Sequence, residues 1–149
     1  MISTLKDRIA REESGFTLIE LLVVIIILGI LMAIAIPSYL SFKDRANKSA
    51  AQSNIRSVVP SIEAWNADND GTATDVDADS STAGYQGMTM ALLNSKYDQS
   101  IVPTNYTLTL NTSATDFCVQ TSKGGWTAWK RGPAGQIQVA ANGSSSICT

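Results

Sequence analysis

Histidine is absent from this chain of 149 residues, and its absence excludes several kinds of catalytic and metal site. Histidine is the commonest general base and the commonest metal ligand, and Ser-His-Asp and Cys-His arrangements both need it. The sequence also has no glycine-rich phosphate loop and no carboxylate pair framed by apolar residues. It therefore predicts neither an enzyme nor a protein that binds a cofactor.

Charge and cysteine are also scarce. Eleven basic and 13 acidic residues give a net charge of −2, so bulk charge does not draw the protein onto nucleic acid. The two cysteines, Cys118 and Cys148, lie in the polar C-terminal part. Such a pair beside a membrane segment is typical of one disulfide formed in an oxidising compartment. Two buried free thiols in a cytosolic domain are the alternative.

One long apolar run carries most of the hydrophobicity. In residues 16–36, 18 of 21 residues are apolar, and the exceptions are Thr17, Glu20 and Gly29. A helix of this length spans about 30 Å, which matches the hydrocarbon core of a bilayer. The run is too long for a secretory signal peptide, and no small-residue cleavage site follows it. It therefore predicts a membrane-spanning helix that ends near Pro37.

The basic residues do not decide the orientation of this helix, because three lie on each side. They are Lys6, Arg8 and Arg11 before it, and Lys43, Arg45 and Lys48 after it. If the cysteines form a disulfide, the C-terminal part lies outside the cytoplasm and the N-terminal segment inside.

Glu20 is a carboxylate inside the apolar run. Burying a charge there costs about 2.5–3.5 kcal/mol at the bilayer centre, and less near an end. One interpretation is that the side chain snorkels to the headgroups. The other is that it needs a cation, and no Lys or Arg lies between Arg11 and Lys43. That cation would come from another molecule, or from an amine created by cutting the chain nearby.

The hexapeptide GFTLIE at residues 15–20, with its apolar tail, resembles the N-terminal motif of type IV pilins and pseudopilins. The resemblance implies that a membrane-embedded prepilin peptidase cuts after Gly15 and that Phe16 becomes an N-methylated terminus. It also implies that Glu20 pairs with the terminal amine of a neighbouring subunit. Gly29 and Pro37 match positions where, in this family, the helix loosens during assembly.

Beyond the apolar run, apolar residues recur in steps of three and four, as on one face of a helix. They are Tyr39, Phe42, Ala46, Ala50, Ile55, Val58, Val59, Ile62 and Trp65. The pattern predicts one helix over 16–67, with a membrane or filament-core half at 16–37 and an amphipathic half at 38–67. Two helices broken at Pro37 are the alternative.

The remainder of the chain predicts a small α+β head. Residues 68–104 form an acidic loop with a short helical turn at 88–94. From residue 105 the apolar period becomes two, which indicates about four short strands in an antiparallel meander over 105–149. The predicted pilin fold is thus a long N-terminal α-helix packed on this sheet. A Cys118–Cys148 bond would tie the C-terminus to a strand.

Two clusters of residues in the head could each bind a ligand or have only a structural role. Residues 66–77 partly match a calcium loop, with Gly71 at its turn, although a solvated acidic loop explains them as well. The candidate ligands are Asn66, Asp68, Asp70 and Asp77. A second cluster could bind single-stranded DNA, or could only pack and solvate the sheet. Its members are Lys123, Trp126, Trp129, Lys130 and Arg131.

These features together predict a structural subunit of a type IV pilus, made as a precursor with a leader at 1–15. The subunit would assemble with copies of itself after peptidase cleavage, through an inner-membrane platform, into a cell-surface filament. Before assembly it would cross the cytoplasmic membrane once. A pseudopilin of a type II secretion system is one alternative. A single-pass anchored binding or sensor module that never polymerises is another.

Overall fold

The computed structural model describes residues 15–71, 76, 81–111, 113, 115–141 and 147–148. The leader expected at 1–15 lies outside this part except for Gly15, and Asp77 of the calcium candidate lies outside it too. The chain divides into two compact units, Met1–Ser41 and Phe42–Thr149. Each unit is described by itself below.

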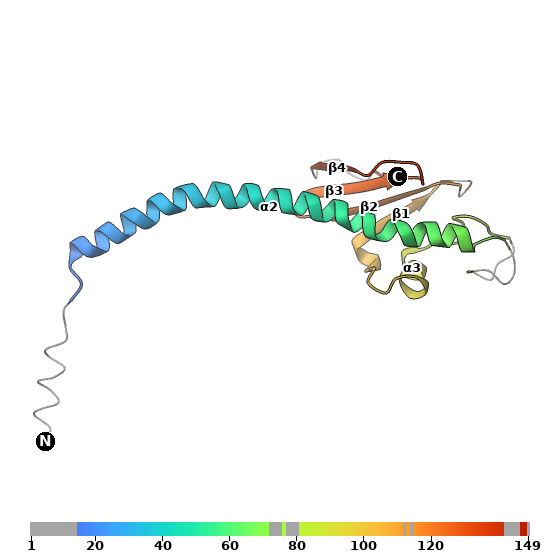
Figure 1. Cartoon of the computed structure of the whole chain (residues 1–149), viewed down its shortest axis with the longest axis horizontal. Coiled ribbons are helices and arrows are strands. Elements are labelled where there is room, and N and C mark those ends of the chain that lie inside the picture. Colours follow the sequence, from blue (N-terminus) through green and yellow to red (C-terminus); the bar gives the residue numbers. More distant parts are fainter. Residues whose placement is uncertain are drawn as a thin grey trace, which may run out of the picture. The chain divides into compact units, whose positions relative to one another are not determined.

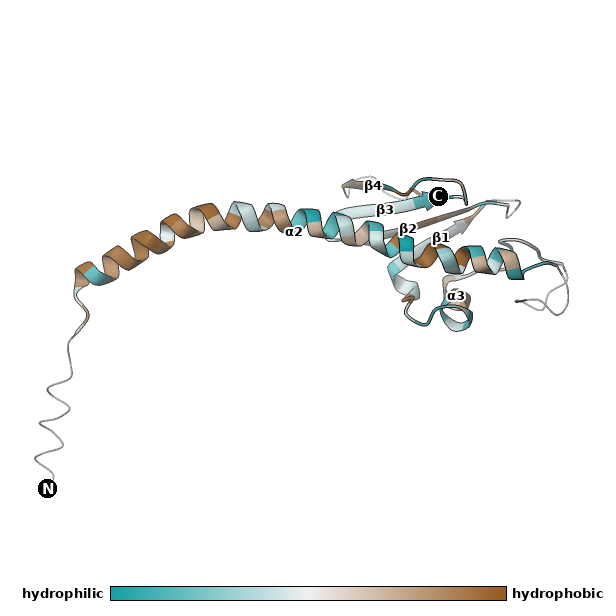
Figure 2. Ribbon diagram, in the orientation of Figure 1, coloured by the Kyte–Doolittle hydropathy of each residue, from teal (hydrophilic) through white to brown (hydrophobic). Residues whose placement is uncertain are grey.

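A single helix, α2, runs from Leu18 to Asp68 and contributes to both units (Figure 1). It continues through Pro37, so the alternative of two helices broken there is wrong. Proline removes one backbone donor from a helix, and nearby hydroxyl groups often compensate. The Ser38 hydroxyl donates to the Ile34 carbonyl at 3.1 Å, one turn earlier. Figure 2 shows that α2 is apolar on all sides in its first half and mixed in its second.

In the second unit, one stripe of α2 is buried. It consists of Ala51, Ile55, Val58, Ile62 and Trp65, all 0% exposed. The steps of four and three keep these residues on one side of the helix.

The stripe differs from the expected one at its N-terminal end. Phe42 is 71% exposed, and Ala46 is exposed as well. N-terminal to the buried stripe, polar residues contact the sheet instead: the half-buried Asn47 donates from Nδ2 to the Gly124 carbonyl at 3.3 Å, and the exposed Asp44 accepts at Oδ1 from Trp126 Nε1 at 2.6 Å. Gly124 has φ +52°, and a Cβ there would lie 2.1 Å from Asn47 Nδ2, so only glycine fits.

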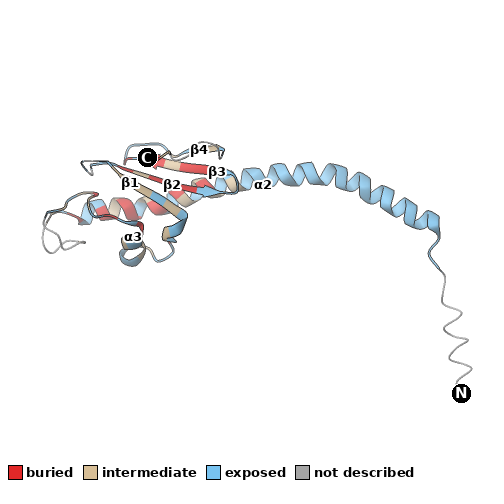
Figure 3. Ribbon diagram, turned by 180° about the vertical axis from the view of Figure 1, so that it is seen from behind, coloured by how far each residue is buried: buried red, intermediate tan, exposed pale blue. Residues whose placement is uncertain are grey.

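Four strands form an antiparallel sheet in the order β1-β2-β3-β4. They are β1 (Tyr106–Leu110), β2 (Phe117–Lys123), β3 (Trp126–Arg131) and β4 (Gln138–Ala141). Consecutive strands pair, so the predicted meander and the α+β fold are confirmed. Alternate residues of β2, Phe117, Val119 and Thr121, are buried against α2 (Figure 3).

The connection between α2 and the sheet closes around Trp65. Trp65 Nε1 donates to the Gln86 carbonyl at 3.1 Å, and its ring lies 6.4 Å from that of Tyr97. A short helix, α3, covers Met90–Lys96, two residues later than the expected turn at 88–94. Its start is set by Thr89, whose side chain accepts a hydrogen bond from the Leu92 amide. A 3-10 turn, η1 (Pro103–Asn105), then leads into β1.

Lys130 is buried, which corrects the expectation that the lysines of its cluster solvate the sheet edge. It is 6% exposed, and its ammonium donates to three backbone carbonyls in the β3–β4 loop. These are the carbonyls of Gly132 at 2.5 Å, Pro133 at 2.7 Å and Gly135 at 2.8 Å. Because three oxygens replace the ammonium's hydration shell, burial of the charge is compensated. Lys130 therefore holds this loop in its conformation.

We expect Lys130→Met to lower the free energy of unfolding by about 2–3 kcal/mol, because three carbonyls lose a charged donor. Denaturant unfolding of the full-length protein in detergent, followed by tryptophan fluorescence, measures this change. Lys123→Met is the matched control: Lys123 is exposed at the end of β2, and its loss should cost under about 0.5 kcal/mol. Equal stability of the two variants would contradict the assigned role of Lys130.

Candidate assembly site

The N-terminal segment Gly15–Thr17 is not helical, and α2 begins directly after it at Leu18. The Thr17 hydroxyl accepts a hydrogen bond from the Glu20 amide at 3.3 Å. In return, Glu20 Oε2 accepts from the Thr17 amide at 2.9 Å and from the Thr17 hydroxyl at 2.8 Å. This reciprocal arrangement is a capping box, which satisfies backbone donors that the first turn of a helix leaves unpaired.

The capping role of Glu20 was missed in the sequence analysis, although its signal is local. Threonine followed three residues later by glutamate, immediately before an apolar run, is the sequence pattern of a capping box. Thr17 is a neutral partner, so it orients the Glu20 carboxylate without neutralising its charge. Both bonds to Thr17 use Oε2, and no described residue bonds to Oε1.

The first unit presents a continuous apolar surface. Every described residue of this unit, from Gly15 to Ser41, is exposed, including Phe16 at 74% and Leu18 at 81%. Soluble monomers rarely expose contiguous apolar patches beyond a few hundred Å². By length and composition α2 is also able to cross a membrane. This surface therefore needs lipid or other protein around it.

Gly29 and Pro37 both lie inside this exposed part of α2. A Cβ at Gly29 would meet nothing within 4 Å, so the fold of the single chain does not require glycine there. Helix loosening at the two positions remains a prediction.

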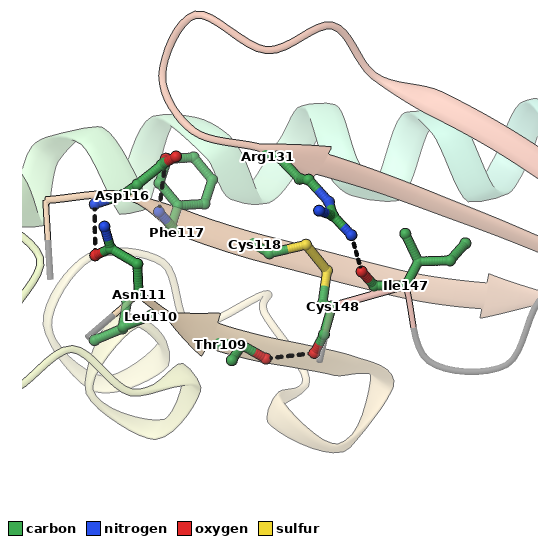
Figure 4. Close-up of a pocket in the computed structure, with 9 residues that line it drawn as sticks. All are labelled: Thr109, Leu110, Asn111, Asp116, Phe117, Cys118, Arg131, Ile147 and Cys148. Atoms are coloured by element: carbon green, nitrogen blue, oxygen red, sulfur yellow. Dashed lines mark hydrogen bonds between the residues drawn. A yellow bond between two sulfur atoms is a disulfide. The ribbon is translucent and has the colours of Figure 1, made fainter. Parts of the chain in front are cut away.

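The two cysteines are joined in a disulfide, Cys118 to Cys148, with Cα atoms 5.4 Å apart (Figure 4). Hydrogen bonds hold the same C-terminal segment beside β1 and β2. Gln120 Oε1 accepts from the amides of Ile147 and Cys148, at 3.1 and 3.2 Å, and the Thr109 hydroxyl donates to the Cys148 carbonyl at 2.7 Å. The Arg131 guanidinium donates to the Ile147 carbonyl. The disulfide is thus one of several attachments for this segment.

The candidate calcium ligands that the structure describes do not come together in one site. No group of three or more potential metal ligands occurs in the part of the chain that the structure describes. Asp68 Oδ2 accepts a hydrogen bond from the Tyr97 hydroxyl at 2.8 Å, and Asn66 is exposed on the last turn of α2. Asp70 is exposed just beyond the helix, and Asp77 lies outside the described residues. Calcium binding stays a prediction.

The aromatic and basic cluster does not form one surface. Trp126, Ala128 and Lys130 alternate with Thr127, Trp129 and Arg131 along β3, so the two sets point to opposite faces of the sheet. On the α2 side, Trp126 bonds to Asp44, and the Lys48 ammonium lies 5.0 Å from the centre of its ring. Trp129 and Arg131 remain on the other face. The cluster therefore offers single-stranded DNA fewer cations than the sequence indicated.

The family model for the prokaryotic N-terminal methylation motif matches residues 10–36. The chain is 32% identical over 120 residues to the "Type IV wide pilus major component PilA4" of Thermus thermophilus, which covers 80% of each protein. The chain belongs to the type IV pilin and pseudopilin family. No solved structure matches it.

Two other relatives match a shorter part of this pilin-family chain. It is 41% identical over 59 residues to "Type II secretion system core protein G" of Pseudomonas aeruginosa, which is 40% of this chain and 42% of that protein. It is 44% identical over 52 residues to "Type IV major pilin protein PilA" of Myxococcus xanthus, 35% of this chain and 24% of that protein. The chain thus matches less than half the length of these two relatives.

The family model spans Gly15, Phe16, Glu20 and Gly29. These are four of the residues to which the sequence assigned processing, assembly and helix-loosening roles. The match supports the motif itself, and the individual roles are taken up as proposals below.

The Tyr97 hydroxyl donates a hydrogen bond to Asp68, the last residue of α2. We expect Tyr97 to lower the free energy of unfolding as the pH rises above 10. Burial, the hydrogen bond to Asp68 and the charge of Asp68 together raise the pKa of Tyr97 to about 12, from 10.0. The folded protein thus holds this proton after the unfolded chain has released it. The stability contributed is complete below pH 10 and is lost between about pH 10 and 12.

Spectrophotometric titration of tyrosinate in the full-length protein tests this expectation. Asp68→Asn removes the charge beside the hydroxyl and should shift the late-titrating tyrosine to lower pH. Tyr97→Phe should remove one late-titrating group and flatten the fall of stability above pH 10. A second tyrosine, Tyr85, remains late in both variants, because burial and its bond to Glu63 raise its pKa. If Tyr97→Phe removes a tyrosine that titrates near pH 10, and Asp68→Asn leaves the late phase unchanged, Tyr97 is not perturbed.

Proposed function

We propose that the chain is a structural subunit of a type IV pilus, made as a membrane-anchored precursor and polymerised through α2. The observation that carries this proposal is the extent of the match to the pilus component of Thermus thermophilus. That match covers 120 residues, more than twice the 51 residues of α2, and so must include much of the head. The match to the secretion protein of Pseudomonas aeruginosa covers 59 residues.

Processing is the first step of this function. A prepilin peptidase would cut between Gly15 and Phe16 on the cytoplasmic side, and Phe16 would then be methylated on its amine. The bond lies in the non-helical segment directly before α2, where backbone can enter a protease cleft. Both residues are exposed, and a Cβ at Gly15 would meet nothing within 4 Å.

The membrane stage places the apolar part of α2 in the bilayer and the head outside the cytoplasm. The Cys118–Cys148 bond supports this orientation, because disulfides persist in oxidising compartments. An inner-membrane assembly platform would then draw subunits into the filament. In that filament, burial of residues 16–36 against the same segment of other copies replaces their contact with lipid.

Glu20 would set the axial position of each subunit. Cleavage creates an ammonium group at Phe16, the cation that the sequence around Glu20 lacks. In an apolar surrounding, an unpaired carboxylate is costly and a nearby ammonium compensates it. The capping box presents the carboxylate at the start of α2, and Oε1 is the oxygen that a neighbouring subunit's amine would approach.

A pseudopilin of a type II secretion system is the second candidate, because the protein G relative from Pseudomonas aeruginosa is 41% identical over 40% of the chain. A membrane-anchored module that does not polymerise is a third outcome. The relatives named above are components of pili and of a secretion machine, so the proposal assigns the chain no enzymatic activity.

The first prediction of this proposal concerns the mature N-terminus. Mass spectrometry of the native protein should find it at Phe16, with one extra methyl group. A Gly15→Val variant should stay uncleaved, and since the added side chain meets nothing in the fold, this loss would report on the peptidase. A native protein that retains Met1 would favour the anchored module.

The second prediction separates the charge of Glu20 from its capping role. Glutamine also completes a capping box, so Glu20→Gln keeps the cap and removes the charge. We expect it to lower filament yield by at least about tenfold, because the ion pair is lost in a low-dielectric core. Thr17→Ala removes the cap, keeps the charge, and should cost about 1 kcal/mol of helix stability while filaments still form.

Electron microscopy of cell-surface filaments, with immunoblots for processing and membrane insertion, measures both effects. All variants should be processed and inserted. Normal filaments from Glu20→Gln together with loss of filaments from Thr17→Ala would show that capping, and not the ion pair, is what assembly needs.

A further inference from the structure

The sheet face that points away from α2 carries one large apolar side chain, Trp129. The strand register places it in a row across the sheet, with Gln120 on one side and Gln138 on the other. The other strand residues on this face are polar or small: Thr107, Thr109, Cys118, Ser122, Thr127, Arg131 and Ala140. Trp129 is half-buried and is not part of the core cluster around Trp65.

Trp129 lies in a hollow of about 380 Å³. The lining consists of Trp129, Arg131, Gly135, Gln136, Gln138 and Ile147. This volume is within the range of about 300–1,000 Å³ that is usual for small-molecule sites. Arg131, Gln136 and Gln138 are exposed, so their polar groups can reach a ligand from water.

Hydrogen bonds fix both walls of the hollow. On one side, Lys130 binds the carbonyls of the β3–β4 loop that leads to Gln136. This loop folds back so closely that a Cβ on Gly135 would lie 1.8 Å from the Arg131 carbonyl oxygen.

The opposite wall is the C-terminal segment. Gln120 Oε1 accepts a hydrogen bond from the amide of Ile147. The Arg131 guanidinium donates to the Ile147 carbonyl (Figure 4). The next residue, Cys148, is bonded to β2 through the disulfide. A hollow fixed on both sides loses little conformational entropy when a ligand enters, which favours binding.

We propose that this hollow binds a pyranose saccharide, with a preference for one that carries a carboxylate. The indole of Trp129 is a flat apolar platform of the kind on which the C–H face of a sugar ring packs. The amides of Gln136 and Gln138 each supply a donor and an acceptor, the pairing that adjacent sugar hydroxyls require. The Arg131 guanidinium has donors beyond the one used for Ile147, and it suits a carboxylate.

Single-stranded nucleic acid is a poorer fit to the same surface. Binding of that class needs several cations along the strand besides an aromatic platform. Arg131 is the one cationic residue in the lining, and Lys130 is buried beneath the loop on the other face.

Equilibrium dialysis of the processed full-length protein tests the proposal. The protein is kept in a detergent without a sugar headgroup, and assembled filaments are tested in parallel by co-sedimentation. The probes are tritium-labelled hyaluronan hexasaccharide, which carries carboxylates, and chitohexaose, which carries none. An oligothymidine of about twenty nucleotides tests the alternative ligand class. The site lies wholly within the second unit, so binding in detergent does not depend on filament assembly.

Both saccharides should bind, the hyaluronan probe more tightly. Trp129→Ala should weaken both by about tenfold or more, as removal of a central aromatic contact does. Gln138→Ala is a second variant at an exposed position, and it should weaken both as well. Arg131→Gln should weaken the hyaluronan probe selectively. Thr107→Ala, in the same row but outside the hollow, is the matched control and should leave binding unchanged.

Absence of saccharide binding to the wild-type protein would overturn the proposal. So would saccharide binding that survives both Trp129→Ala and Gln138→Ala. Binding of oligothymidine alone, lost in Trp129→Ala, would assign the hollow to nucleic acid instead. Equal loss of both saccharides in Arg131→Gln would overturn the carboxylate preference. Saccharide binding by a chain that forms no filaments would leave this proposal standing while the proposed function failed.

Discussion

The packing of one stripe of α2 against the sheet is the contact on which the rest of the head depends. Five residues, from Ala51 to Trp65, are fully buried by it, and the connection through α3 closes around the last of them. N-terminal to Ala51, polar residues of the helix contact Gly124 in the β2–β3 turn and Trp126 at the start of β3. Before Phe42 the described residues are exposed, although the helix is apolar on every side. The same helix thus supplies the core of a small domain and an apolar surface that requires lipid or other subunits.

Hydrogen bonds and one disulfide hold the irregular segments of the head in place. The Lys130 ammonium organises the β3–β4 loop, and Gln120, Thr109 and the disulfide hold the C-terminal segment. The hydrogen bonds among these attachments replace water around buried or half-buried polar groups, and buried polar groups in proteins need such partners. One consequence is that two irregular segments become firm walls on either side of Trp129. The outer face of the sheet thereby gains a shaped hollow where a bare meander would be flat.

Glu20 has two roles: its side chain caps α2, and its negative charge needs a cation. The sequence analysis identified only the second. Its position at the third residue of α2 makes it a helix cap, with Thr17 as a neutral partner in the same chain. Its charge is not neutralised by that partner. The capping bonds therefore orient the carboxylate but do not neutralise its negative charge. A cation from outside the described segment would have to do so. The proposed pairing with a terminal amine is compatible with capping of the first turn, because the capping bonds use only Oε2 and the amine would approach Oε1.

Local patterns in the sequence were sufficient to predict the long helix, the four-strand meander, the prepilin motif and the pairing of Cys118 with Cys148. Period and composition act over a few residues, and the cysteines had no other partner. The capping box was equally local and could have been found. The burial of Lys130, the separation of Trp126 from Trp129, and the polar contacts of Asp44 and Asn47 were decided only by the tertiary structure. Each depends on which face of a strand or helix meets a partner far away in the chain, as Asp44 meets Trp126 across 82 positions. Local periodicity determines that faces exist, whereas packing between distant elements determines which face is buried.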